Sequence, residues 1–248
     1  MKRNRPRLSR RTFWVLCALL VCLRLALTGF QQAYIWAGGA PLDDELMFRA
    51  ANSITAGQWL GAYDYLTLSK AMFFPVWLAL LHALHLPYLI SGAALWCGAA
   101  LTAAFAFSPL WRKKDPEQGR VLTLALFAVL AFLPSSWASY TLRVYRDNIF
   151  PALCLYFFAG MAGMALRAVQ EKPAPLWPWL AAAGAGLACG YLDREDAGLF
   201  LLPFAAAATG IVAVVLVGKR RWRALAAQAI PYAMLGVGVL TFCTLNYT

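Results

Sequence analysis

Two adjacent aspartates, Asp43 and Asp44, are well suited to acid–base chemistry. They stand beside Glu45 in a polar stretch between the first two long apolar runs. A carboxylate can take the proton of an attacking hydroxyl group during group transfer. Neighbouring side chains on a helix diverge by about 100°, so only one aspartate can point at a given reacting atom. We expect one to be a catalytic base, and the other to orient it, act on it by charge repulsion or bind a divalent metal. The alternative is that Asp43 caps the helix LDDELMFRAA.

Three basic residues have the chemistry to stabilise a departing phosphate, namely Lys70, Arg143 and Arg146. The flexible stem of Lys70 can reach a phosphate at the depth of lipid headgroups, although a plain surface lysine would look the same. Arg143 and Arg146 are three residues apart, so one helical turn would present both on the same side. The alternative for Arg146 is an ion pair with its neighbour Asp147.

A second acidic cluster occurs much later, in YLDREDAG. Asp193 and Asp196 have the spacing of a capping box at the start of a helix. A helix cap does not need the additional charged residues Arg194 and Glu195. Asp193 and Glu195 are therefore candidate ligands for an acceptor or for a metal such as Mg²⁺ or Mn²⁺. The chain has no glycine-rich phosphate loop, no nucleophile elbow and no zinc-ligand spacing.

The composition is that of a polytopic membrane protein. Of 248 residues, 62% are hydrophobic and 13% are charged, which is more apolar surface than a soluble core of this size hides. The formal net charge of +11 comes from short basic clusters between apolar runs, a pattern that orients membrane proteins, so we expect no nucleic-acid partner. The six cysteines all lie in apolar runs and are expected to be small core residues.

Apolar runs near the ~20 residues of a bilayer crossing predict an all-α chain with about seven membrane spans. Residues 1–11 form a basic, cytoplasmic amino terminus, and residues 12–248 form a single membrane core. The first run contains Arg24, which we expect to face protein or a water-filled cleft. The predicted spans are 12–30, 88–110, 121–138, 149–166, 176–192, 197–218 and 229–245.

The apolar run over 73–86 is only ~14 residues long, which favours a surface helix over a crossing one. With 73–86 at the surface, most of the 22 basic residues fall on the cytoplasmic side. Most of the 11 acidic residues then lie in loops on the outer face. The large loop 31–87 is extracytoplasmic in this topology, and it is the predicted active-site loop.

This loop resembles the first extracytoplasmic loop of the C-type glycosyltransferase superfamily (GT-C), in particular its mannosyltransferase-like and aminoarabinose-transferase-like members. The resemblance rests on Asp43 and Asp44 just after the first span, on Lys70 and Pro75 in SKAMFFPVWLALLHAL, and on GQWLGAYDYLTLSK. GT-C enzymes take a sugar from a polyprenyl-phosphate or polyprenyl-diphosphate carrier. The first acid of the pair is usually catalytic in that family, which favours Asp43. Its core of about seven spans precedes a variable carboxyl-terminal part, and this chain ends near the close of such a core, as a fragment would.

The resemblance implies a bacterial inner-membrane glycosyltransferase with its site on the outer face. Its partners would be the carrier-linked sugar and membrane lipid, with Asp43 or Asp44 as base. Lys70, Arg143 and Arg146 would hold the carrier phosphate, with or without a divalent metal. Two alternatives remain: a non-catalytic subunit that binds the lipid carrier or assists assembly, and a transporter. A transporter more often has its charged residues at mid-membrane.

Overall fold

The protein is built from helices. Its computed structural model describes residues 8–36, 38–39, 41–61, 70–112, 116–137, 139–170 and 174–246. The helices are α1 Arg10–Thr28, α2 Pro41–Thr55, α3 Phe73–Ala83, α4 Tyr88–Phe107, α5 Pro109–Arg112, α6 Pro116–Ala131, η1 Pro134–Trp137, α7 Ser139–Leu142, η2 Arg146–Asn148, α8 Phe150–Ala168, α9 Trp177–Asp193, α10 Gly198–Gly218, α11 Trp222–Ala227 and α12 Ile230–Asn246. Within the described residues, the only β-type pairing is an isolated bridge between Tyr34 and Arg143. The predicted all-α class is confirmed.

In the part of the chain that the structure describes, five helical segments are long and apolar enough to cross a bilayer, and they indicate a membrane protein. These segments are Arg10–Thr28, Tyr88–Trp111, Phe150–Ala168, Gly198–Gly218 and Trp222–Asn246. Helices also lie at the two other positions predicted as spans. However, α6 has 16 residues and α9 has 17, fewer than the ~20 that a crossing needs. The short apolar helix α3 has 11 residues and lies within the segment 73–86.

Prolines set several helix boundaries. Pro151 and Pro178 lie in the first turns of α8 and α9, where the missing N–H of proline removes no helical hydrogen bond. Pro134 begins a 3-10 helix soon after α6 ends at Ala131. The helix predicted over 121–138 therefore stops early, because proline interrupts the α-helical hydrogen-bond pattern.

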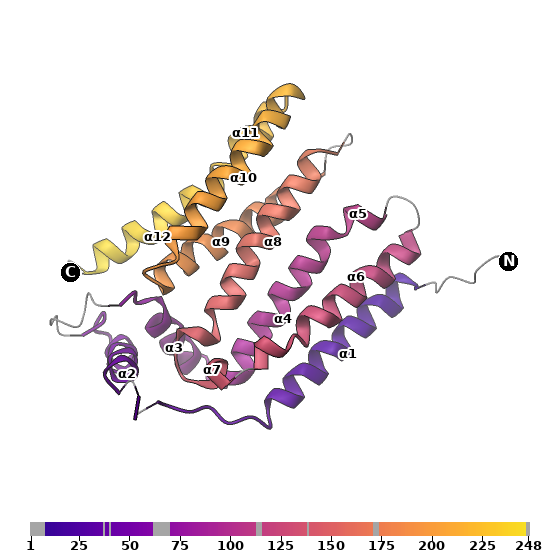
Figure 1. The fold of residues 1–248 in the computed structure, drawn as a ribbon. Helices are drawn as coiled ribbons and strands as arrows, with labels where there is room; N and C mark the ends of the chain where they lie inside the picture. The colour runs from indigo at the N-terminus through magenta and orange to yellow at the C-terminus, as the bar shows by residue number, and fades with distance from the viewer. Residues whose placement is uncertain are drawn as a thin grey trace.

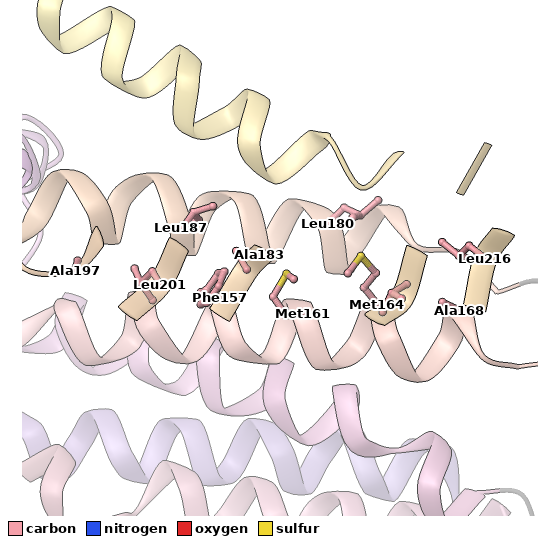
Figure 2. Close-up of a cluster of buried hydrophobic side chains, with 12 residues drawn as sticks. Phe157, Met161, Met164, Ala168, Leu180, Ala183, Leu187, Ala197, Leu201 and Leu216 are labelled. Carbon is pink, nitrogen blue, oxygen red and sulfur yellow. The ribbon is translucent and has the colours of Figure 1, made fainter. Parts of the chain in front are cut away.

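Close contact between α8 and α9 forms the central core (Figure 2). A Cβ atom on Gly160 would lie 2.3 Å from the Ala183 nitrogen, and one on Gly186 would lie 2.4 Å from the Phe157 nitrogen. Glycine at both sites lets the two backbones approach, as small residues do between membrane helices. Side chains from α8, α9 and α10 fill the remaining space, including Phe157, Met161, Leu187 and Leu201, each 2% exposed or less.

The two ends of the helical bundle differ in character. Helices α2, α3 and α7 gather at one end, beside the end of α1 (Figure 1). The start of α1, α5 and the junction of α10 with α11 lie toward the opposite end (Figure 1). That junction carries the basic residues Lys219, Arg220 and Arg221. The predicted acidic and basic loops therefore lie at opposite ends of the molecule.

Candidate active site

Asp44 forms a buried ion pair with Arg143 at the end of the bundle that carries α2, α3 and α7. Asp44 is 1% exposed and Arg143 is 8% exposed. Arg143 Nε donates to both carboxylate oxygens, at 3.0 Å and 3.3 Å, and Nη2 donates to Oδ1 as well. The backbone N–H of Trp36 donates to Oδ2 at 2.7 Å. Asp44 is thus fully engaged, and it joins α2 to two other segments of the chain.

The bridge beside this ion pair strengthens the same connection. Tyr34 donates its backbone N–H to the carbonyl of Leu142 at 3.2 Å and accepts from the N–H of Val144 at 2.9 Å. The segment after α1 is therefore held against residues 142–144 by backbone hydrogen bonds as well as by the charged pair. This arrangement fixes the start of α2, where both aspartates lie.

Asp43 has a more accessible carboxylate than Asp44. Its side chain is 35% exposed, and its Oδ2 lies 3.3 Å from Lys70 Nζ. The hydroxyl group of Tyr145 donates to the same oxygen at 3.3 Å. The two aspartates point to different partners, as expected for adjacent residues on a helix. Asp43 is the member of the pair that an incoming hydroxyl group can reach.

Tyr145 lies between the charged groups of the site. Its ring centroid is 4.3 Å from Arg143 Cζ and 5.1 Å from Arg146 Cζ, within the range of cation–π attraction. Burial raises the pKa of Tyr145, and the opposing charge of Arg146 does not cancel this effect. The phenol therefore stays protonated, and its O–H group donates a hydrogen bond to Asp43. The sequence reasoning missed Tyr145, although its place between two candidate arginines in LRVYRD was an available signal.

Arg146 connects the site to the turn between α9 and α10. Its Nη1 donates to Glu195 Oε2 at 2.7 Å, so the alternative pairing with Asp147 is wrong. Asp147 instead pairs with Arg194 at 3.1 Å. Arg146 is 5% exposed, and a buried arginine of this kind requires a carboxylate partner.

Glu195 also holds the segment that carries Lys70. Its Oε1 accepts the backbone N–H of Ala71 at 2.8 Å. Burial would raise the pKa of Glu195, but hydrogen bonds from its own N–H, from Arg146 and from Ala71 outweigh it and hold the pKa below its ordinary value. Glu195 is thus a charged link between α9, the segment before α3, and Arg146.

Asp193 has an unusual environment. It is completely buried, and within the described part of the chain neither of its carboxylate oxygens has a hydrogen-bond partner. Its backbone carbonyl accepts from Arg146 Nη1 at 3.2 Å. Asp193 therefore lies behind the site, where neither solvent nor a large acceptor reaches it.

The structure brings the sequence candidates together at one end of the molecule. Asp43, Asp44 and Glu195 each face a lysine or an arginine. Among the described residues, no group of three or more His, Cys, Asp or Glu side chains has metal-site geometry. Residues 62–69 of the predicted active-site loop lie outside the described residues.

No family model, curated protein or solved structure matches the chain. The functional conclusion therefore depends on the chemistry of these residues.

Proposed function

We propose that this chain is a GT-C-type membrane glycosyltransferase that moves a sugar from a polyprenyl-phosphate-type carrier to an acceptor on the extracytoplasmic face. The observation that carries the proposal is the contrast between the two aspartates. Asp44 is buried in an ion pair with Arg143, whereas Asp43 is partly exposed beside Lys70 and Tyr145. A base for the acceptor and a cation for the carrier phosphate thus stand side by side.

The reaction is a direct displacement at the anomeric carbon of the sugar. Asp43 takes the proton of the acceptor hydroxyl, and the acceptor oxygen forms a bond to the anomeric carbon. The bond from that carbon to the carrier phosphate oxygen breaks, and its electron pair leaves with the phosphate. Lys70 stabilises the negative charge that develops there.

The pairing of Asp43 with Lys70 couples carrier binding to activation of the base. The two groups are 3.3 Å apart, and both are partly exposed. An incoming phosphate competes with Asp43 for the lysine. Once the lysine binds the phosphate, the Asp43 carboxylate is free to contact the acceptor hydroxyl. Carrier binding therefore prepares Asp43 to accept a proton.

Arg143 and Arg146, the other predicted phosphate ligands, have a supporting role in this proposal. Both are buried, and each already binds a carboxylate. Their contribution to phosphate binding is the positive potential around Tyr145, together with the positioning of Asp43 and Lys70. In this proposal Glu195 belongs to the same framework through its ion pair with Arg146.

The proposed topology has seven spans, with α6 and α9 crossing in addition to the five longer segments. The amino terminus is cytoplasmic, and the membrane is a bacterial inner membrane. The separation of basic junctions from the acidic site, at opposite ends of the bundle, supports this orientation (Figure 1). The same separation disfavours a transporter, because the charged cluster lies at one end instead of at mid-membrane.

A carrier-binding subunit without catalytic activity is the second candidate. The observation that favours it is that each acid of the site already has a cationic partner. Such a paired cluster can bind an anionic carrier by exchanging partners without ever moving a proton.

Sugar transfer from a polyprenyl-phosphate donor by the full-length membrane protein tests the proposal. Asp43→Asn is expected to lower turnover by ~10²–10⁴-fold, the usual contribution of a general base, with donor binding retained. Glu45→Gln is the matched control, because Glu45 is an exposed carboxylate two residues after Asp43 on α2, and it should leave turnover unchanged.

Two outcomes would reject the proposal in different ways. Full turnover in Asp43→Asn eliminates the base assignment. Donor binding by the wild-type protein without transfer to any acceptor favours the carrier-binding subunit.

A further inference from the structure

Arg24 is a buried cation whose partners are all neutral. It is 2% exposed within α1. Its Nη1 donates to the Thr28 hydroxyl at 2.6 Å, and its Nη2 donates to the Ser136 carbonyl at 2.9 Å. Its Cζ lies 3.7 Å from the ring centroid of Trp137. Within the described residues, Nε has no hydrogen-bond partner, and no carboxylate forms an ion pair with this guanidinium.

A pocket of about 50 Å³ is lined in part by Arg24. Asn148, which also lines the pocket, donates its Nδ2 to the Thr141 carbonyl at 2.8 Å. Its Oδ1 is buried and has no partner among the described residues. A Cβ atom on Gly92 would lie 2.1 Å from that oxygen, so glycine at this position of α4 makes room for the Asn148 amide. The hydroxyl groups of Ser135 and Tyr140 belong to residues of the same lining.

A donor on a cation and an acceptor are therefore buried beside the pocket, and neither has a partner among the described residues. Burial of an arginine without a negative partner is strongly unfavourable, and ionisable groups in such positions tend to be functional. Water can satisfy the two hydrogen bonds but cannot compensate the charge. An oxyanion can do so, because a guanidinium binds carboxylate or phosphate through parallel N–H bonds.

The size of the pocket limits what it can hold. One water molecule requires ~10–15 Å³ of such space, so about 50 Å³ accommodates a few waters or one compact ionic group. A whole sugar ring does not fit. The occupant is thus a single phosphate or carboxylate group with a neighbouring hydroxyl group, while the rest of the ligand extends outside.

We propose that this pocket is a binding site for the phosphate or carboxylate group of a hydroxyl-bearing ligand. Arg24 binds the anionic oxygens, and Asn148 Oδ1 accepts a hydrogen bond from the ligand's hydroxyl group. The phosphoglycerol headgroup of a lipid and a small water-soluble phosphate ester share this chemistry. The site is separate from the pair Asp43 and Lys70, so it does not depend on the proposed glycosyl transfer.

The pocket and the candidate active site share one segment of backbone. Thr141 and Asn148 line the pocket, whereas Arg143 and Arg146, between them in sequence, bind Asp44 and Glu195. A ligand on Arg24 is therefore positioned to stabilise the segment that carries both arginines of the site.

The test is a titration of the full-length protein in an uncharged detergent, followed by the midpoint of thermal unfolding. One arm uses glycerol 1-phosphate, with glycerol as its control. The other uses short-chain phosphatidylglycerol, with phosphatidylcholine of the same chain length as its control. Ionic strength is held constant. We expect a saturable rise of the midpoint in the wild-type protein, because a ligand that binds only the folded state stabilises it.

Three variants locate the effect. Arg24→Met should weaken the apparent affinity by at least ~10-fold, since it removes the charged donor. Gly92→Ala keeps Arg24 but pushes its Cβ against Asn148 Oδ1, and it should also weaken binding. Arg10→Met, at an exposed position on the same helix, should bind like the wild-type protein.

A rise of the unfolding midpoint with both glycerol 1-phosphate and phosphatidylglycerol indicates that the site binds a water-soluble phosphate. A rise with phosphatidylglycerol alone indicates that it binds a lipid headgroup. No response in the wild-type protein overturns the proposal. Equal responses in the wild-type protein and in Gly92→Ala overturn it as well, and this comparison decides the matter if Arg24→Met does not fold.

Discussion

Replacement of Asp44 by asparagine is expected to destabilise the fold far more than the same replacement of Asp43. Asp44 is 1% exposed and receives hydrogen bonds from Arg143 and from the Trp36 backbone. The substitution leaves Arg143, itself 8% exposed, as a buried charge without its partner. Asp43 is 35% exposed and pairs with a partly exposed lysine, so its ion pair is screened by solvent.

The magnitude follows from the distance and the burial. At the 3.0 Å that separates Arg143 Nε from Asp44 Oδ1, two unit charges attract by about 5.5 kcal/mol at an effective dielectric constant of ~20. Removal of one partner of a buried ion pair typically costs about 3–5 kcal/mol. Loss of an exposed pair such as Asp43 with Lys70 costs below ~1 kcal/mol.

The assay is a double-mutant cycle on the free energy of unfolding in detergent micelles. It compares Asp44→Asn, Arg143→Met and the double variant that combines these two substitutions. The double variant removes both charges, so we expect it to be more stable than either single variant. Asp43→Asn is the control on the same helix. Equal losses in Asp43→Asn and Asp44→Asn, or a double variant whose loss is the sum of the single losses, would refute the reasoning.

Two other predictions concern the turn after α9 and the packing of α8 against α9. The depressed pKa of Glu195 means that its ion pair stabilises the protein above the ordinary carboxyl pKa and that this contribution disappears as the pH falls through the folded-state value. Thermal unfolding of the wild-type protein between pH 7 and pH 3 should show this loss of stability at acid pH. Glu195→Gln should lose less stability over the same pH range. The difference between the two proteins should be below ~1 kcal/mol, because the side chain is partly exposed. Gly160→Ala should cost ~1–3 kcal/mol, because its Cβ would lie 2.3 Å from the Ala183 nitrogen, a larger effect than the ~1 kcal/mol gained in helix propensity. Gly210→Ala is the matched control, since a Cβ there meets nothing within 4 Å; equal stability changes at the two glycines would contradict the packing argument.

Much of the helical framework could be predicted from the sequence, because apolar runs of bilayer length commonly fold as α-helices. Their ends were harder to predict. The helix expected to run to residue 138 ends at Ala131, where Pro134 competes with continued apolar character. The lengths of α6 and α9 show the same difficulty, since hydrophobicity alone does not fix where the hydrogen-bonded turns stop.

The residue types of the candidate site could be predicted from the sequence, but which acid pairs with which base could not. The acids and bases could be assigned to one face from the order of spans and charges. Asp44 and Arg143 are 99 residues apart in the chain, so their contact depends on helix packing that no local pattern encodes. The partner of Arg146 is Glu195 for the same reason. The difference between the two aspartates likewise arises from burial, which follows from the tertiary structure.

The ion pair of Asp44 with Arg143 also has a consequence for biogenesis. The chain is synthesised from its amino terminus, so in the proposed topology the loop that carries Asp44 is exported well before the residues around Arg143. Until then the carboxylate has no guanidinium to bind and remains hydrated in the outer compartment. The connection between Trp36, α2 and the Arg143 segment therefore closes late in membrane insertion. A ribosome-stalled intermediate that ends before Arg143 should consequently leave its first exported loop open to proteases.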